Sequence, residues 1–339
     1  MTERRWDPTL GEWRTFATHR QTRTFLPPTD ACPLCPTRDP EHPTEIPRSS
    51  YQLAVFDNKF PSLLAQPPAP SISGTPLHPV EPAIGATEVV LYSDRHDLTL
   101  ADLDVEHIHR LVDVWADRYA HLGDREEIGY VFVFENKGEA VGVTLNHPHG
   151  QIYGYPDVPP RPLQELTVAT RHQSEHGTCV WCDEVANEYA DAVRVVAANT
   201  SFIAYVPFAA RFPYEVHVVS NRHAPCLLDL SDPERGALAS VLKTVLTGYD
   251  ELFGFSLPYV MSMHQAPTED GPWLSVSHLH IEFTPLHRSA NRLKYIAGSE
   301  LGAGAFINDT EPEQTAEELR AAVARVAAAA GLADHQPEE

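Results

Sequence analysis

Apolar and polar positions along the chain predict short strands separated by turns, with one longer stretch at helical spacing. In 100–123, apolar side chains recur with the period of a helix that packs one face on a sheet. Thr99 and Asp102 have the spacing of a capping box before this helix. Apolar runs bounded by turn residues predict strands over 51–60, 88–93, 129–136 and 142–153.

The same order of elements recurs in the second half of the chain. A capped helix is expected to begin near Ser231, and an alanine-rich helix to end at Gly331. Further strands are expected over about 192–198, 202–207, 215–223, 257–264 and 278–283.

Two pairs of matching segments indicate an internal duplication. EVHVVSNRH at 215–223 matches EVVLYSDRH at 88–96 without a gap, and a CVWC segment echoes an earlier CPLC. We infer two units of strands around one long helix, related by a pseudo-two-fold axis. The expected halves are 1–170 and 171–339.

Composition and charge narrow the function. A net charge of −22 and a pI of about 5.1 disfavour nucleic acid as a partner, because phosphate backbones need a basic surface. No apolar run approaches a membrane span and the N-terminus lacks an apolar signal region, so we expect no membrane partner and a cytoplasmic location. A phosphorylated substrate would need local cations, and Arg20 and Arg23 are the candidates.

Four of the five cysteines form two C-x-x-C pairs, which in a reducing compartment favour metal sites over disulfides. Cys32, Cys35, His96 and His147 make a Cys2His2 set for one tetrahedral zinc ion. All four protein positions are filled, so this zinc is expected to be structural. The alternative is two buried thiols and two hydrogen-bonded histidines.

The segment HPHGQ is the candidate catalytic centre. His147, His149 and Gln151 would leave the same face of an extended segment, and Gly150 would let a ligand approach the backbone. With His147 assigned to zinc, His149 is the candidate nucleophile for attack on phosphorus. The Gln151 amide can donate a hydrogen bond but cannot take a proton, which favours transfer over hydrolysis.

The internal repeat predicts a second Cys2His2 site. If the halves are equivalent, the matching positions are Cys179, Cys182, His223 and His278.

HPHGQ, preceded by FENKGEAVGVTLN, resembles the galactose-1-phosphate uridylyltransferase family, a branch of the histidine-triad superfamily. The resemblance runs from RRWDPTLGEW through CPLC and VFDNKF to RSANRLKYIAGSE. It implies an α+β fold with a duplicated histidine-triad-like unit, in which helices pack on a mostly antiparallel sheet. It also implies uridylyl transfer from UDP-glucose to galactose 1-phosphate through a uridylyl-histidine, giving glucose 1-phosphate and UDP-galactose.

The resemblance further implies a set of substrate contacts in a homodimer with shared active sites. The last five residues of the list that follows would come from the other subunit. The implied contacts are Arg20, Arg23, Phe56, Asn58, Lys59, Phe60, Asn136, Gly142, Thr144, Gln151, Lys294, Tyr295, Ala297, Ser299 and Glu300. Ser299 and Phe306 depart from the family pattern, so the hexose that the enzyme prefers stays open.

Other functions remain possible at this point. One is a nucleotide-sugar or dinucleotide phosphorylase that uses the same histidine with inorganic phosphate. The others are a metal-dependent hydrolase and a zinc-braced binding module without activity. The resemblance also suggests a competing set for a second zinc or iron ion, made of Glu165, His264, His278 and His280. Both second sets include His278, and we favour the cysteine set because two thiolates bind zinc more strongly than a carboxylate.

Overall fold

The computed structural model describes residues 2–22 and 25–331. Its strands are β1 (Thr2–Asp7), β2 (Glu12–Ala17), β3 (Ala54–Asp57), β4 (Val80–Pro82), β5 (Ala86–Leu91), β6 (Tyr130–Lys137), β7 (His149–Tyr155), β8 (Val195–Ala198), β9 (Phe202–Tyr205), β10 (Val216–Ser220), β11 (Tyr259–His264), β12 (His280–Pro285), β13 (His287–Ser289) and β14 (Arg292–Leu293). Its α-helices are α1 (Val105–Gly123), α2 (Pro160–His176), α3 (Val180–Asp191), α4 (Asp232–Phe253), α5 (Trp273–Val276), α6 (Gly298–Ala303) and α7 (Pro312–Ala329).

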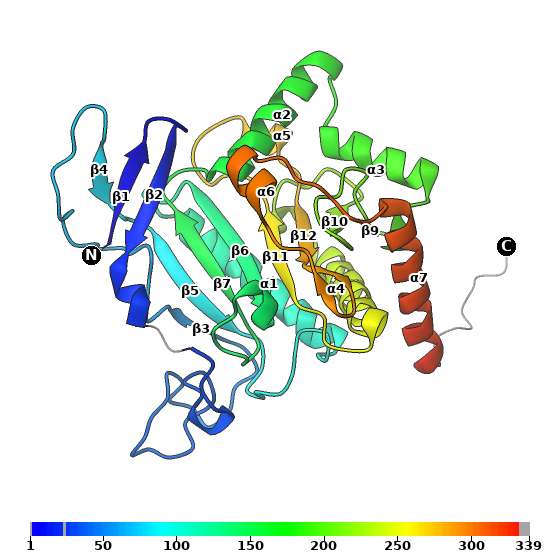
Figure 1. Ribbon diagram of the computed structural model, residues 1–339, viewed down its shortest axis with the longest axis horizontal. Coiled ribbons are helices and arrows are strands. Elements are labelled where there is room, and N and C mark those ends of the chain that lie inside the picture. Colours follow the sequence, from blue (N-terminus) through cyan, green and yellow to red (C-terminus); the bar gives the residue numbers. More distant parts are fainter. Residues whose placement is uncertain (1, 23–24, 332–339) are drawn as a thin grey trace.

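One nine-stranded antiparallel sheet runs through both halves in the order β3-β5-β7-β6-β11-β12-β10-β9-β8 (Figure 1). The halves meet where β6 pairs with β11, so that Asn136 lies opposite Val260. Reading outward from this seam, β7, β5 and β3 have β12, β10 and β9 as their counterparts. The predicted α+β fold and its pseudo-two-fold duplication are confirmed.

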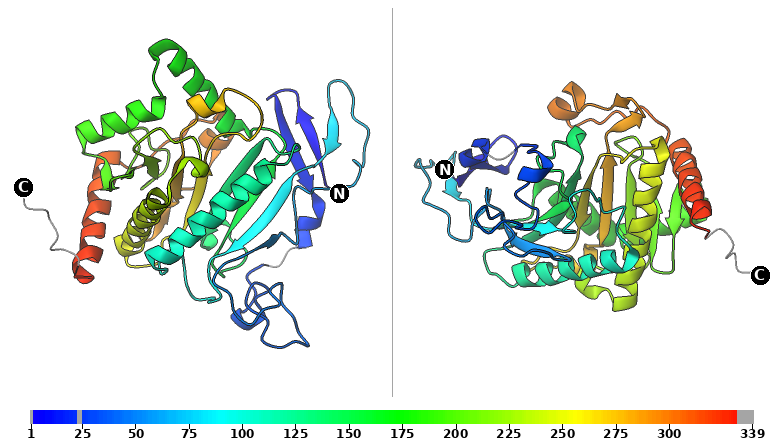
Figure 2. Two further views of the ribbon diagram at one scale, coloured as in Figure 1. Left: turned by 180° about the vertical axis from the view of Figure 1, so that it is seen from behind. Right: turned by 90° about the horizontal axis from the view of Figure 1, so that it is seen from below.

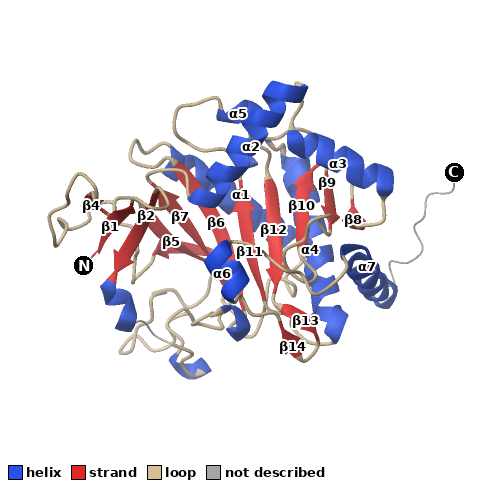
Figure 3. Cartoon of the chain, turned by 45° about the horizontal axis from the view of Figure 1, so that its top comes forward, coloured by secondary structure: helices blue, strands red, loops and turns tan. Residues whose placement is uncertain are grey.

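The hydrophobic core lies between the sheet and the two long helices. α1 and α4 lie side by side across one face, with α7 beside α4 (Figure 2). Ile108, Leu111 and Trp115 of α1 are fully buried, as the helical spacing predicts. Each such side chain stabilises the fold by about 1.5–3 kcal/mol through removal of apolar surface from water. Functional side chains are therefore confined to the other face of the sheet, where α6 lies (Figure 3).

The start of α1 differs from the prediction. Thr99 does donate to the Asp102 carboxylate, but this bond closes a turn before the helix. The cap is Asp104, whose carboxylate accepts from the His107 amide at 2.7 Å. In the second half, Ser231 caps α4 in a capping box with Glu234, as predicted.

The match of 88–96 to 215–223 without a gap does not hold in the strands, where the two halves are shifted by one residue. Leu91 lies opposite His149, and in the second half Val219 lies opposite His280. The first half has one additional residue, Tyr92, after this strand, and its amide donates to the carbonyl of Pro148.

No helix in the described part of the chain is long and apolar enough to cross a membrane. The cytoplasmic location stays a prediction.

Candidate active site and metal-binding groups

A cleft of about 110 Å³ opens on the sheet face opposite α1 and α4, at His149 and Gln151 of β7. It brings together eight of the predicted residues and five that were not predicted. The predicted ones are Arg20, Phe56, Asn58, Lys59, Phe60, Thr144, His149 and Gln151. The others are Pro33, Leu34, Glu45, Val89 and Leu145. Pro33 and Leu34 lie between the two cysteines of the first pair, so the motif itself could have indicated them.

His149 is held as a neutral imidazole with one defined tautomer. Its Nδ1 donates to the carbonyl oxygen of His147 at 2.7 Å, which leaves the lone pair on Nε2. Burial lowers the pKa of His149, and the bond to the His147 carbonyl opposes this only in part. The cleft therefore presents an unprotonated ring nitrogen, which is the form a nucleophile requires.

A chain of hydrogen bonds sets the orientation of the Gln151 amide. The amide of Phe60 donates to Asn58 Oδ1 at 2.9 Å, so Asn58 must present its NH2 group. That group donates to Gln151 Oε1 at 3.1 Å. The oxygen of Gln151 is thus occupied, and its own NH2 group is left to donate to a ligand oxygen.

Arg20 is a cation without an acidic partner among residues 2–22 and 25–331. Its guanidinium donates to the Phe60 carbonyl at 3.1 Å and to the Tyr153 hydroxyl at 3.2 Å. Lys59, by contrast, pairs with Glu45 at 2.6 Å. Arg20 is therefore the lining cation whose charge is available to a phosphate group.

Gly150 lets the sheet pack against Tyr92 on the helical face. A Cβ at position 150 would lie 2.1 Å from Tyr92 Oη and 3.1 Å from the Phe134 carbonyl oxygen. Tyr92 is fully buried, so its ring has little room to move. The structure thus gives glycine at position 150 a packing reason on the helical face, and the predicted approach of a ligand to its backbone stays a prediction.

We expect Gly150→Ala to lower the free energy of unfolding by about 1–3 kcal/mol, because the added methyl overpacks this contact. Adding Tyr92→Phe removes the nearest atom and should restore part of the loss. Gly236→Ala in α4 is the control, since its Cβ would be 3.6 Å from the nearest atoms. Denaturant unfolding measures wild type and the three variants, and equal stability of Gly150→Ala and wild type would refute the packing argument.

Several predicted contacts lie outside this cleft. Asn136 and His149 line a neighbouring cavity of about 340 Å³. Gly142 has a φ of 80° at the end of a short 3-10 turn, a conformation that suits glycine, and it lines neither cavity. Arg23 lies outside the described residues.

The five predicted contacts from the C-terminal region also lie apart from the cleft of their own chain. Lys294 is buried, pairs with Glu300 at 3.1 Å and donates to the Ile307 carbonyl. Ala297 precedes α6, and the Ser299 hydroxyl donates to the carbonyl of Ala305, just beyond this helix. Tyr295 is 75% exposed.

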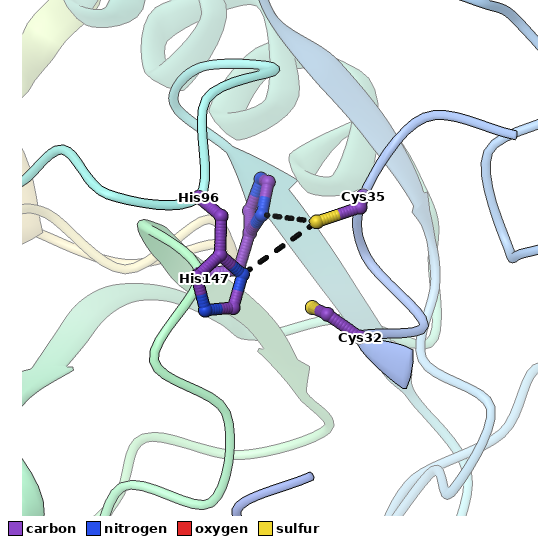
Figure 4. Close-up of side chains that lie close together, drawn as sticks. All are labelled: Cys32, Cys35, His96 and His147. Atoms are coloured by element: carbon purple, nitrogen blue, oxygen red, sulfur yellow. Dashed lines mark hydrogen bonds between the residues drawn. The ribbon is translucent and has the colours of Figure 1, made fainter. Parts of the chain in front are cut away.

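The first predicted metal set forms one group (Figure 4). Its four ligand atoms lie within 4.8 Å of one another, and Cys35 Sγ is 3.5 Å from Nδ1 of both His96 and His147. Zn–S and Zn–N bonds of about 2.3 and 2.0 Å put tetrahedral S···N edges near 3.5 Å. His147 Nε2 donates to the Ser93 carbonyl at 2.8 Å, which turns Nδ1 toward the thiols. These residues fit a zinc ion.

Position 147 also corrects the prediction for HPHGQ. The strand β7 begins at His149, so His147 lies in the bend before it. His147 therefore faces the cysteines, while His149 and Gln151 face the cleft.

The second cysteine set forms in the same way. Cys179, Cys182, His223 and His278 again lie within 4.8 Å of one another. His278 Nδ1 is 3.6 Å and 3.7 Å from the two Sγ atoms, and its Nε2 donates to the Ser220 carbonyl. His223 Nδ1 is buried and has no partner among the described residues. This group also fits a zinc ion.

The competing metal set of Glu165, His264, His278 and His280 does not come together as four residues. Glu165, His264 and His280 lie together, with His264 Nδ1 2.7 Å from the Glu165 carboxylate. His278 turns Nδ1 toward the two cysteine thiols and donates from Nε2 to the Ser220 carbonyl, so the structure does not bring it into the group of Glu165. The two groups do not compete for His278, and three residues of the competing set remain as a separate group able to hold a metal.

Family models decide the identity. The model described as "Galactose-1-phosphate uridyl transferase, N-terminal domain" matches residues 1–159, and the C-terminal domain model matches 165–332. The chain belongs to the galactose-1-phosphate uridylyltransferase family. A galactose-1-phosphate uridylyltransferase from Thermotoga maritima is 37% identical, over 94% of this chain and 98% of the relative.

Solved structures agree with this family assignment. A structure described as a uridylyltransferase mutant aligns with a TM-score of 0.85 and 34% identity, over 96% of this chain and 98% of that chain. An ADP-glucose phosphorylase from Arabidopsis thaliana with bound ADP-glucose aligns with a TM-score of 0.72 and 25% identity, over 94% and 98%. The uridylyltransferase family thus shares its fold with a phosphorylase. The domain boundary predicted at residue 170 stays a prediction.

Proposed function

We propose that His149 carries the uridylyl group in the transfer reaction of this family. His149 Nε2 attacks the α-phosphorus of UDP-glucose, and the bond from this phosphorus to the bridging oxygen breaks. Glucose 1-phosphate leaves with that oxygen. A phosphate oxygen of galactose 1-phosphate then attacks the same phosphorus, the P–N bond breaks, and UDP-galactose is released. Galactose-1-phosphate uridylyltransferase activity itself follows from the family assignment.

The hydrogen bond from His149 Nδ1 to the His147 carbonyl is the observation that carries this proposal. It fixes the tautomer before substrate binds, and it stabilises the positive charge that develops on the ring when Nε2 attacks. The fixed Gln151 amide supplies a donor for a phosphoryl oxygen but no base for water. The intermediate is thus held for a second sugar phosphate.

The experiment is exchange of label between UDP-glucose and radioactive glucose 1-phosphate with no galactose 1-phosphate present. A covalent intermediate allows this exchange, whereas direct transfer between two bound sugars does not. Absence of exchange in an active preparation would refute the intermediate.

A phosphorylase is the second candidate, favoured by the fold shared with an ADP-glucose phosphorylase. It would use the same histidine and pass the nucleotidyl group to inorganic phosphate. Incubation of UDP-glucose with phosphate as the sole acceptor separates the two functions, because only the phosphorylase then forms UDP.

We propose that Arg20 binds the phosphate groups. Arg20→Ala should lower kcat/KM by about tenfold or more, through loss of a charge-assisted hydrogen bond worth about 1.5–3 kcal/mol. The control is Arg14→Ala, since Arg14 is an exposed residue whose ion pair within the described part of the chain is with Glu12. Steady-state kinetics measure both, and equal kcat/KM values for the two variants would contradict this role.

We propose that zinc occupies both Cys2His2 groups. Each group holds two thiols and two imidazoles, the soft and borderline ligands that zinc prefers. Both are closed by four protein ligands, so zinc would brace the segments that carry these ligands and supply no reaction step.

We propose that a second copy of this chain covers the segment 295–307. Tyr295, Leu301 and Ile307 are 75%, 77% and 60% exposed there, and exposed large apolar side chains gathered on one segment indicate a contact surface. A homodimer would cover these side chains and, by family resemblance, place Lys294 near the cleft of the other subunit.

Leu301→Glu should therefore shift the chain from dimer to monomer, because a buried charge opposes association. Sedimentation velocity measures this, and transfer activity should fall with the dimer fraction. A wild-type chain that sediments as a monomer at micromolar concentration would exclude the homodimer.

A further inference from the structure

Tyr153 lies two positions beyond Gln151 on β7, on the face of the sheet that carries the cleft. Side chains two residues apart on a strand leave the same face, so His149, Gln151 and Tyr153 form one row. Tyr153 is 9% exposed and is not among the residues that line the cleft. It therefore contacts the lining residues from behind, where it can act on them and not on the substrate itself.

Aromatic neighbours on two strands hold the Tyr153 ring. Its centroid lies 5.0 Å from that of Phe134 on β6, with the two planes at 78°. On its own strand the Tyr155 ring lies 5.8 Å away at a tilt of 52°. Edge-to-face packing of this kind favours one ring orientation, so the Tyr153 hydroxyl has a defined place beside the cleft.

The Tyr153 hydroxyl has two partners, one a cation and the other an amide. Its oxygen accepts a hydrogen bond from Arg20 Nη1 at 3.2 Å, and its proton points to Gln151 Oε1 at the longer distance of 3.5 Å. A hydroxyl has one proton and two lone pairs, so it can serve both partners at once. The guanidinium charge polarises the O–H bond and strengthens its donation to Gln151.

For Arg20, the bond to Tyr153 sets the rotation of the guanidinium group. Nη1 also donates to the Phe60 carbonyl at 3.1 Å, so the two hydrogens of this nitrogen have separate acceptors. Because the guanidinium is planar, two anchors on one nitrogen fix the plane of the whole group. Nη2 and Nε are then the donors that remain for a phosphate group, and they have a defined direction.

For Gln151, the Tyr153 hydroxyl is a second donor to the amide oxygen. Asn58 Nδ2 donates to the same oxygen at 3.1 Å. A flipped amide would direct its NH2 group at the NH2 group of Asn58 and would give up the Tyr153 proton as well. Tyr153 therefore opposes a flip that would turn an oxygen, and no longer a donor, toward the phosphoryl group.

We propose that Tyr153 is a positioning residue of the transfer reaction, which couples the cation of Arg20 to the amide of Gln151. Through this one hydroxyl, the group that binds phosphate and the group that donates to the phosphoryl oxygen keep a fixed relative geometry. The proposal rests on the proposed function, because it needs Arg20 and Gln151 to contact the phosphates of the substrate. The phenol itself takes part in no bond-making or bond-breaking step.

The test is a pair of double-mutant cycles built on Tyr153→Phe, which keeps the ring and removes only the hydroxyl. The readout is exchange of label between UDP-glucose and glucose 1-phosphate, because it reports the first half-reaction alone. We expect Tyr153→Phe to lower kcat/KM for this exchange about tenfold. In the Arg20→Ala and Gln151→Ala backgrounds the same change should have a smaller effect, of about threefold or less, since the hydroxyl has already lost a partner. An effect as large as in the wild-type background, in either variant, would overturn the coupling.

Tyr155→Phe is the matched control. This ring lies next to Tyr153 on the same face, and in the described part of the chain its hydroxyl has no hydrogen bond to Arg20 or Gln151. The control should exchange label at the wild-type rate, and thermal melting should show that both phenylalanine variants are folded. Equal exchange rates for Tyr153→Phe and Tyr155→Phe would overturn the proposal.

The single variants separate this proposal from the function on which it rests. Wild-type exchange in Arg20→Ala would refute the phosphate-binding role of Arg20, and the positioning role of Tyr153 with it. Impaired exchange in Arg20→Ala beside wild-type exchange in Tyr153→Phe would refute the positioning role alone.

Discussion

Replacement of His149 by alanine is expected to abolish uridylyl transfer while the fold stays intact. The variant loses the nitrogen whose lone pair is fixed by the bond from Nδ1 to the His147 carbonyl. Gln151 cannot replace it, because an amide nitrogen is not a nucleophile. Loss of a nucleophile that acts in both half-reactions should lower kcat by about 10⁴-fold or more.

The measurement combines kinetics with trapping of the intermediate. Wild-type enzyme incubated with UDP-glucose and quenched should carry a uridylyl group on the peptide that contains His149, and the variant should carry none. Circular dichroism and thermal melting serve as the control, since His149 is only partly buried and bonds to a neighbouring carbonyl. A labelled peptide elsewhere in the chain would assign the nucleophile to another residue.

The double variant Cys32→Ser, Cys35→Ser is expected to lose one zinc ion, much of its thermal stability and nearly all activity. This group joins three segments that are distant in the sequence, at residues 32–35, 96 and 147. Zinc binding to such small sites contributes about 10–16 kcal/mol of apparent free energy in isolated zinc fingers. Its loss should release Pro33 and Leu34 from the cleft and the bend that orients His149.

The matched variant Cys179→Ser, Cys182→Ser should lose the other zinc ion and some stability, with less than about a tenfold fall in transfer. The lining of the active-site cleft has no residue from this second group. Metal analysis, calorimetric melting and kinetics compare the two variants. Retention of two metal ions in the second variant would instead assign the second ion to Glu165, His264 and His280.

The residues that belong to short motifs or to the internal repeat could be predicted from the sequence. The C-x-x-C pairs, the HPHGQ segment and the internal repeat were sufficient to predict the two sets of two cysteines and two histidines that the structure brings together. Strand pairing brings the residues of each set together, and the apolar pattern of the sequence predicts those strands. The start of α1 was missed because two acidic residues near its N-terminus, Asp102 and Asp104, can both accept from a backbone amide.

Other features depend on contacts between distant segments and could not be predicted. The need for glycine at position 150 comes from its contact with the Tyr92 ring, and only the fold shows that this ring packs against the strand. Arg20 and Lys59 look equivalent in the sequence, and only the fold shows that Glu45 neutralises one of them. The sequence placed His278 in two metal sets. Its orientation is set by a hydrogen bond to the Ser220 carbonyl, and a backbone carbonyl cannot be identified from the sequence pattern.

The seam between β6 and β11 bears on the ancestry of the molecule. A half on its own would expose β6 as an open sheet edge, with unpaired N–H and C=O groups over residues 133–137. An ancestral single unit would have needed a second copy of itself to cover that edge. A chain that carries both halves holds this partner permanently within its own sequence. It can then leave one of the two matching histidines covered, as His280 is by the Trp181 ring.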